Sequence, residues 1–85
     1  MDEVKCRILL GILRKESLRE IADFLQLSVS FIHDTVVWLR DQGYIKPWQP
    51  RKARSKELTD TGRQVVAAAY GQEALGGIGN ELGGR

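Results

Sequence analysis

The chain of 85 residues is poor in cysteine and has no long hydrophobic run. Its one cysteine, Cys6, allows no disulfide within the chain, and its apolar neighbours predict a small buried side chain. Because neither a cysteine framework nor a signal-peptide pattern is present, we expect a reducing, cytoplasmic location. The apolar runs, such as Ile8 to Leu13, are much shorter than the roughly 20 residues of a membrane span. We therefore expect no contact with a membrane.

Groups that carry catalytic or metal chemistry are also scarce. The single histidine, His33, has no second histidine or cysteine cluster beside it that would complete a metal site. No nucleophile–base pair, pair of acids or phosphate-cradling loop is apparent. We expect no enzyme activity, no metal, no cofactor and no small-molecule ligand. His33 is either a solvated polar residue or a contact for a base or phosphate.

The net charge is small, at +2, but the positive charge is concentrated in one part of the chain. Residues 44–63 hold six Lys or Arg against two Asp or Glu, so this block alone carries +4. Such a local concentration is typical of a protein that touches a polyanion with one part of its surface. The alternative is a loop that only improves solubility.

The length suits one small domain, which we place at residues 1–70. Six of the last fifteen residues are glycine, and glycine disfavours regular structure through its backbone entropy. Residues 71–85 are therefore expected to form a flexible tail. Leu75, Ile78 and Leu82 keep helical spacing, so the alternative is a frayed helix that orders on a partner.

Three helices are predicted in the first half of the chain. The first covers residues 2–15. The second begins at the capping box of Ser17 and Glu20, in which each residue bonds the other's backbone amide. A tight turn then leads to a third helix over residues 28–42, capped by Ser28 and followed by Gly43. Two short helices joined in this way make a helix-turn-helix.

The second half is expected to contain a small β-hairpin and one more helix. Residues 44–48 favour a strand, which must end or lie at an edge because Pro47 has no amide donor. Residues 49–56 form a basic loop, and Glu57 and Leu58 would return as the partner strand. A last helix runs from Asp60 to roughly Tyr70.

This order of elements resembles the winged helix-turn-helix transcriptional regulators, most closely the multiple-antibiotic-resistance-regulator-like and padR-like groups. The residues that carry the resemblance extend from residue 8 to about 70 and are Leu25-x-Leu27-Ser28-x-Ser30-x-Ile32, Leu39, Gly43-Tyr44-Ile45 and Glu57-Leu58-Thr59-x-x-Gly62-Arg63. The expected fold is mainly α with a two-stranded β-hairpin: a three-helix core, a wing and a C-terminal helix.

The resemblance implies a DNA-binding transcriptional regulator that acts on double-stranded DNA. The recognition helix, residues 28–42, would enter the major groove. Its candidate contacts are Ser28, Ser30, Phe31, His33, Asp34 and Val37. The basic wing, residues 49–56, would lie on the phosphate backbone, with candidate contacts at Lys46, Arg51, Lys52, Arg54 and Lys56. The alternative is a protein–protein interaction module of a transcription or replication assembly, anchored by Phe31 and Trp38.

A homodimer is also expected, because one short chain buries little surface and one recognition helix covers few base pairs. The surface would come from the first and last helices and the tail. Its candidate residues are Leu9, Leu13, Val66, Tyr70 and Leu75. The alternative is that these residues only close the core of the single chain.

Overall fold

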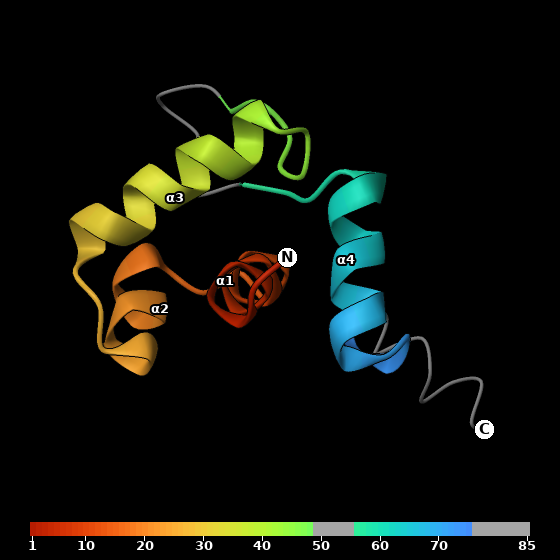
Figure 1. Cartoon of the computed structure of the whole chain (residues 1–85), viewed down its shortest axis with the longest axis horizontal. Helices are drawn as coiled ribbons and strands as arrows, with labels where there is room; N and C mark the ends of the chain where they lie inside the picture. The colour runs from red at the N-terminus through yellow and green to blue at the C-terminus, as the bar shows by residue number, and fades with distance from the viewer. Residues whose placement is uncertain (49–55, 76–85) are drawn as a thin grey trace.

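Helix α1 lies between the other helices of the chain and is seen end-on in Figure 1. The computed structural model describes residues 1–48 and 56–75. Its principal helices are α1 (Glu3–Leu13), α2 (Leu18–Leu25), α3 (Val29–Asp41) and α4 (Asp60–Tyr70). Helix α1 contacts each of the other three, and α2 also packs on α3. The described residues form a small compact helical domain.

Each of these helices begins at a side chain that caps it. Asp2, Ser17, Ser28 and Thr59 all have extended backbone, and each accepts the amide proton of the residue three positions on. The predicted capping box is confirmed: Ser17 Oγ accepts from the Glu20 amide at 3.0 Å, and Glu20 Oε1 accepts from the Ser17 amide at 2.7 Å. The start of each helix is thus encoded locally.

The first three helices end in the same way, at a residue in the left-handed region. These residues are Lys15, Gln26 and Gly43, with φ of 65°, 58° and 89°. After α3, the Gly43 amide donates to the Arg40 carbonyl at 3.0 Å and the Tyr44 amide donates to the Leu39 carbonyl at 2.9 Å, which is the Schellman arrangement. The prediction that Gly43 ends the helix is confirmed. The first helix is shorter than predicted, because the chain leaves helical geometry after Leu13.

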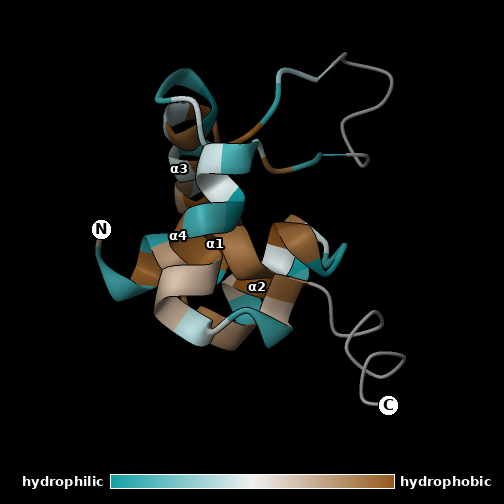
Figure 2. Ribbon diagram, turned by 90° about the vertical axis from the view of Figure 1, so that its right-hand side faces the viewer, coloured by the Kyte–Doolittle hydropathy of each residue, from teal (hydrophilic) through white to brown (hydrophobic). Residues whose placement is uncertain are grey.

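The core forms where the helices meet around α1. Figure 2 shows the hydrophobic residues gathered on these inner sides. Helix α3 contributes a stripe of three fully buried side chains, Ile32, Val36 and Leu39. Fully buried side chains from the rest of the chain pack with them: Ile8, Leu9, Ile21, Ile45 and Val66.

The predicted β-hairpin wing is wrong for the part of the chain that the structure describes. Instead of two strands, one isolated antiparallel bridge joins Ile45 to Leu58. The pairing is short because the backbone amides on either side of it cannot extend a ladder. The Tyr44 amide donates to the Leu39 carbonyl at the end of α3, and Pro47 has no amide proton. A winged fold with a two-stranded hairpin is therefore not what the described residues form.

A narrow paired segment nevertheless connects the end of α3 to the start of α4. The Lys46 amide donates to the Glu57 carbonyl at 2.8 Å, and the Thr59 hydroxyl donates to the Gly43 carbonyl at 2.6 Å. We call this segment, residues 43–46 paired with residues 57–59, the neck. It holds close together the two ends of the basic loop predicted from the sequence, residues 49–56, which we call the basic segment.

Beyond α4 the chain turns at Gly71, and residues 73–75 add one helical turn. Leu75 is half-buried and packs against the core, so the first residues of the predicted tail are part of the domain. The remainder of that tail, residues 76–85, lies outside the described residues. Within residues 1–48 and 56–75, no helix has the length and apolar character needed to cross a membrane.

Candidate functional site

Helix α3 is held on one side and open on the other. Ser28 Oγ accepts the Phe31 amide at 3.0 Å and fixes the first turn. The buried Thr35 hydroxyl donates to the Phe31 carbonyl at 2.8 Å, so it needs no partner outside its own helix. Because the buried stripe anchors α3 to the core, the opposite face is rigid and accessible.

A line of four residues follows the centre of that open face. Ser30, Asp34 and Asp41 are exposed and Val37 is half-buried, at the helical spacing i, i+4, i+7 and i+11. The side chain of Asp34 is 80% exposed. The structure therefore brings together three of the predicted recognition residues, together with Asp41, which sequence reasoning did not include among them.

The two edges of the face differ in character. On one edge lie Phe31 and Trp38, which remain 49% and 45% exposed. Lys5 of α1 places its ammonium 5.4 Å from the centre of the Trp38 ring. His33 lies on the other edge, with its Nδ1 atom 3.7 Å from Asp34 Oδ1. The edge with Phe31 and Trp38, which we call the aromatic edge, is the more apolar of the two exposed edges of α3.

Trp48 fixes the start of the basic segment against α3. The Arg40 guanidinium lies 4.7 Å from the centre of the Trp48 ring, and the Lys56 ammonium lies 4.9 Å from it. Two cations thus share one indole, which links α3 to both ends of the basic segment. Burial lowers the pKa of the Lys56 ammonium below its ordinary value. The sequence alone did not indicate that Trp48 links Arg40 to Lys56.

The cations predicted to contact phosphate are only partly described. Lys46 is exposed at the neck, where its Nζ atom lies 3.4 Å from Glu57 Oε1. Lys56 is half-buried. Arg51, Lys52 and Arg54 lie outside the described residues. The structure does show the described residues on either side of these three cations. They lie at the neck and beside the last turns of α3.

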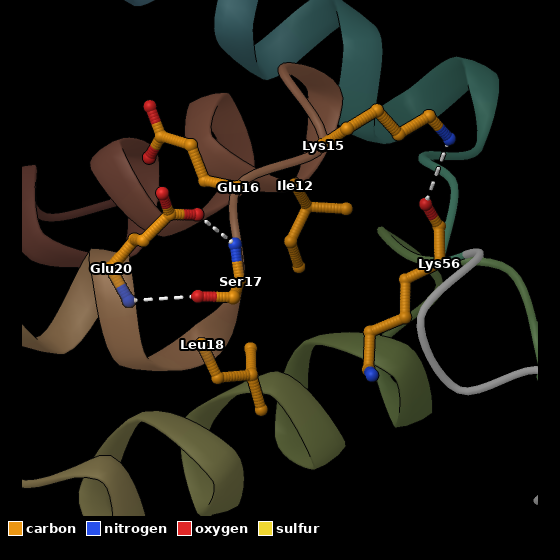
Figure 3. A pocket seen from close by; sticks show the side chains of 7 residues that line it. All are labelled: Ile12, Lys15, Glu16, Ser17, Leu18, Glu20 and Lys56. Atoms are coloured by element: carbon orange, nitrogen blue, oxygen red, sulfur yellow. Dashed lines mark hydrogen bonds between the residues drawn. The ribbon is translucent and has the colours of Figure 1, made fainter.

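A pocket of about 520 Å³ opens between the start of α2 and Lys56 (Figure 3). Lys15 Nζ donates to the Lys56 carbonyl at 3.3 Å across it. The other polar groups in its wall are those of the α2 capping box and Glu16, which pairs with Arg7 at 3.1 Å. Since these groups already have structural partners, the pocket is a packing gap between neighbouring elements and offers no convergent polar groups to a ligand.

A second, more apolar groove of about 600 Å³ lies where the start of α1 meets the ends of α2 and α4. Phe24 and Tyr70 are exposed along it. The Arg7 guanidinium covers one face of Phe24 at 4.4 Å from the ring centre. Partial burial raises the pKa of the Tyr70 phenol above its ordinary value. Sequence reasoning included Tyr70 but did not single out Phe24.

The predicted dimer residues do not form one surface. Leu9 and Val66 are fully buried in the core of this chain, so they have no area to offer to a second copy. Leu13 and Leu75 are half-buried, and Tyr70 is exposed at the end of α4. A sequence cannot separate these cases, because α1 and α4 are apolar on the sides that close the core.

Among the described residues, no three His, Cys, Asp or Glu side chains come together as a metal site would require. Comparisons with models of protein families, with curated proteins and with solved structures found no match for this chain.

Proposed function

We propose that the chain binds double-stranded DNA through the open face of α3, as a regulator of transcription. The observation that carries this proposal is the arrangement of α2, the turn Gln26–Ser28 and α3, which buries one side of α3 and leaves the other free. A 13-residue helix is about 20 Å long and fits a major groove about 12 Å wide. Helix α3 would thus read base edges with Ser30, His33, Asp34 and Val37.

The charge of the chain supports the same orientation. Residues 44–63 carry +4, and the neck and Trp48 hold both ends of the basic segment beside α3. Arg51, Lys52, Arg54 and Lys56 would neutralise phosphates next to the groove that α3 enters. The first turn of α3, capped by Ser28, would offer backbone amides to a further phosphate.

Binding to a labelled random-sequence duplex, followed by fluorescence anisotropy over a salt series, tests the proposal. If two chains neutralise roughly six to eight phosphates, the logarithm of the affinity falls with the logarithm of salt concentration with a slope of about −5 to −7. One chain bound alone gives about half this slope. No binding at low salt, or a slope near zero, contradicts the proposal.

Alanine variants locate the contact. Replacing Arg51, Lys52 and Arg54 with Ala should weaken binding to all sequences about equally and reduce the slope by about 1 for each phosphate that is no longer neutralised. The control removes two exposed cations that lie outside residues 44–63, in the variant Arg14→Ala, Arg19→Ala, and the losses of affinity are compared per cation removed. Equal losses of affinity per cation in both variants would mean diffuse attraction and no defined site.

A second candidate function is favoured by the aromatic edge of α3. Phe31 and Trp38 are about half exposed, and the centre of the face carries two carboxylates that repel a polyanion. A protein partner would use these two rings as anchors. Replacing both with Ala separates the two candidate functions. If the variant still binds duplex DNA, the DNA-binding function is favoured. If the unchanged chain already binds no duplex, the protein-binding function is favoured.

A further inference from the structure

The central line of α3 has an unusual set of hydrogen-bonding groups for a face that reads DNA. Asp34 and Asp41 can only accept when ionised, Val37 offers methyl groups, and Ser30 offers one hydroxyl. The line has no Arg, Lys, Asn or Gln, the side chains that form paired bonds to guanine or adenine. Apart from the Ser30 hydroxyl, which can donate as well as accept, this line of side chains favours bases that present donors or methyl groups.

The pattern of donors and acceptors in the major groove limits which base can pair with a carboxylate. Guanine presents two acceptors there, N7 and O6, and both repel a carboxylate. Adenine presents an amino donor, but its N7 acceptor lies beside it. Cytosine presents its N4 amino donor with no neighbouring acceptor on the same base. A carboxylate at Asp34, with its side chain 80% exposed, is therefore best matched by cytosine.

Val37 lies three residues after Asp34 on the same line, a step of about 4.5 Å along the helix axis. Successive bases of one strand are about 3.4 Å apart. A methyl group on the base next to the cytosine would therefore lie near Val37, and thymine is the base with a methyl group in the major groove. The two side chains would read neighbouring bases.

We infer that α3 reads a pyrimidine step, with Asp34 accepting from a cytosine amino group and Val37 contacting the methyl group of an adjacent thymine. This inference rests on the proposed function and specifies its target. Asp34 would both contact the preferred base and disfavour other bases. Its charge lowers affinity for any DNA and is compensated only where an amino group faces it.

The experiment selects preferred sites from a random duplex library and then measures affinity for single changes in the selected site. Sites that bind the unchanged chain should contain adjacent C and T on one strand. Replacing that C by another base should weaken binding about 5-fold or more. Replacing that T by uracil, which lacks only the methyl group, should weaken binding about 4-fold.

Two variants assign these effects to side chains. Asp34→Asn should bind all duplexes more tightly while its preference for C falls, and Val37→Ala should no longer distinguish T from uracil. Asp23→Asn is the control: it removes one exposed carboxylate from α2, outside the open face of α3, and the preference for C should remain. An Asp34→Asn variant with unchanged preference for C overturns the inference, as do selected sites without a pyrimidine step.

Failure of the inference is distinct from failure of the proposed function. Salt-dependent duplex binding without a pyrimidine preference overturns the inference alone. A chain that enriches no duplex and shows no salt-dependent binding overturns both.

Discussion

Single residues decide how closely the neck and α4 approach each other. Gly62 lies in the first turn of α4 and is buried against the neck. A Cβ atom at this position would strike the backbone carbonyl oxygen of Tyr44, which cannot rotate away as a side chain can. The requirement for glycine at residue 62 is therefore one of space, since its backbone is helical.

Replacing Gly62 with Ala should accordingly destabilise the fold. In an exposed helix the change would stabilise by up to about 1 kcal/mol, but here we expect a loss of about 2 kcal/mol or more from the clash. The free energy of unfolding in urea measures the effect. Gln64→Ala, an exposed position nearby in α4, is the control and should change stability by less than about 0.5 kcal/mol.

The cap of α1 gives a prediction about pH. Bonds from the Lys5 ammonium and the Lys5 amide, each 2.8 Å, hold the pKa of the Asp2 carboxyl below its ordinary value of 3.8. A depressed pKa means that the contribution of Asp2 to stability is present above pH 3.8 and is lost as pH falls through the lower, folded value. The melting temperature of the Asp2→Ala variant should therefore lie below that of the unchanged chain at about pH 6, and the gap should narrow below pH 3.8. A gap that widens on acidification would contradict this assignment.

At the scale of elements, local chemistry was readable from the sequence and pairing between distant segments was not. The caps Ser17 and Ser28 and the stop at Gly43 depend on neighbours within four residues, and the structure confirms them. The hairpin required the chain to pair across a long connection, and what forms is one bridge with the neck around it. Likewise, the stacking of Arg40 and Lys56 on Trp48 is a tertiary interaction, and no local sequence pattern predicts it.

This stacked arrangement leads to a prediction about binding. The Trp48→Leu variant keeps an apolar side chain but removes the ring that links α3 to the end of the basic segment. We expect the unfolding free energy to fall by about 1–2 kcal/mol, since the variant cannot form the two cation–π interactions and packs less surface. Duplex affinity should fall for all sequences alike, because the change touches no base-reading residue. A variant that no longer prefers one sequence over another, with its stability intact, would place Trp48 on the bases instead.

For the molecule as a whole, the homodimer stays a prediction, and the structure limits the surface available to it. With Leu9 and Val66 inside the core, the predicted residues that can reach a second copy are Leu13, Leu75 and Tyr70. The need for two copies follows from the proposed function, because one short helix specifies too few base pairs for selection within a genome. Two α3 helices related by a two-fold axis would occupy successive major grooves about 34 Å apart.

Sedimentation equilibrium at micromolar concentration measures the mass directly. We expect the mass of two chains, and we expect Tyr70→Asp to shift it toward one chain by placing a charge on the exposed end of α4. Gln72→Asp adds the same charge at a nearby exposed residue and serves as the control. A mass of one chain for the unchanged protein refutes the dimer.

The neck has a consequence for how this protein can change over evolution or in the laboratory. The Thr59–Gly43 and Lys46–Glu57 bonds close the connection between α3 and α4 on the domain's side, whatever sequence lies beyond them. The entropic cost of a closed loop grows only with the logarithm of its length, by about 0.6 kcal/mol for each doubling. Insertions between residues 49 and 55 should therefore be tolerated by the helical scaffold. The length and charge of this connection can be altered with little effect on the helices that it joins.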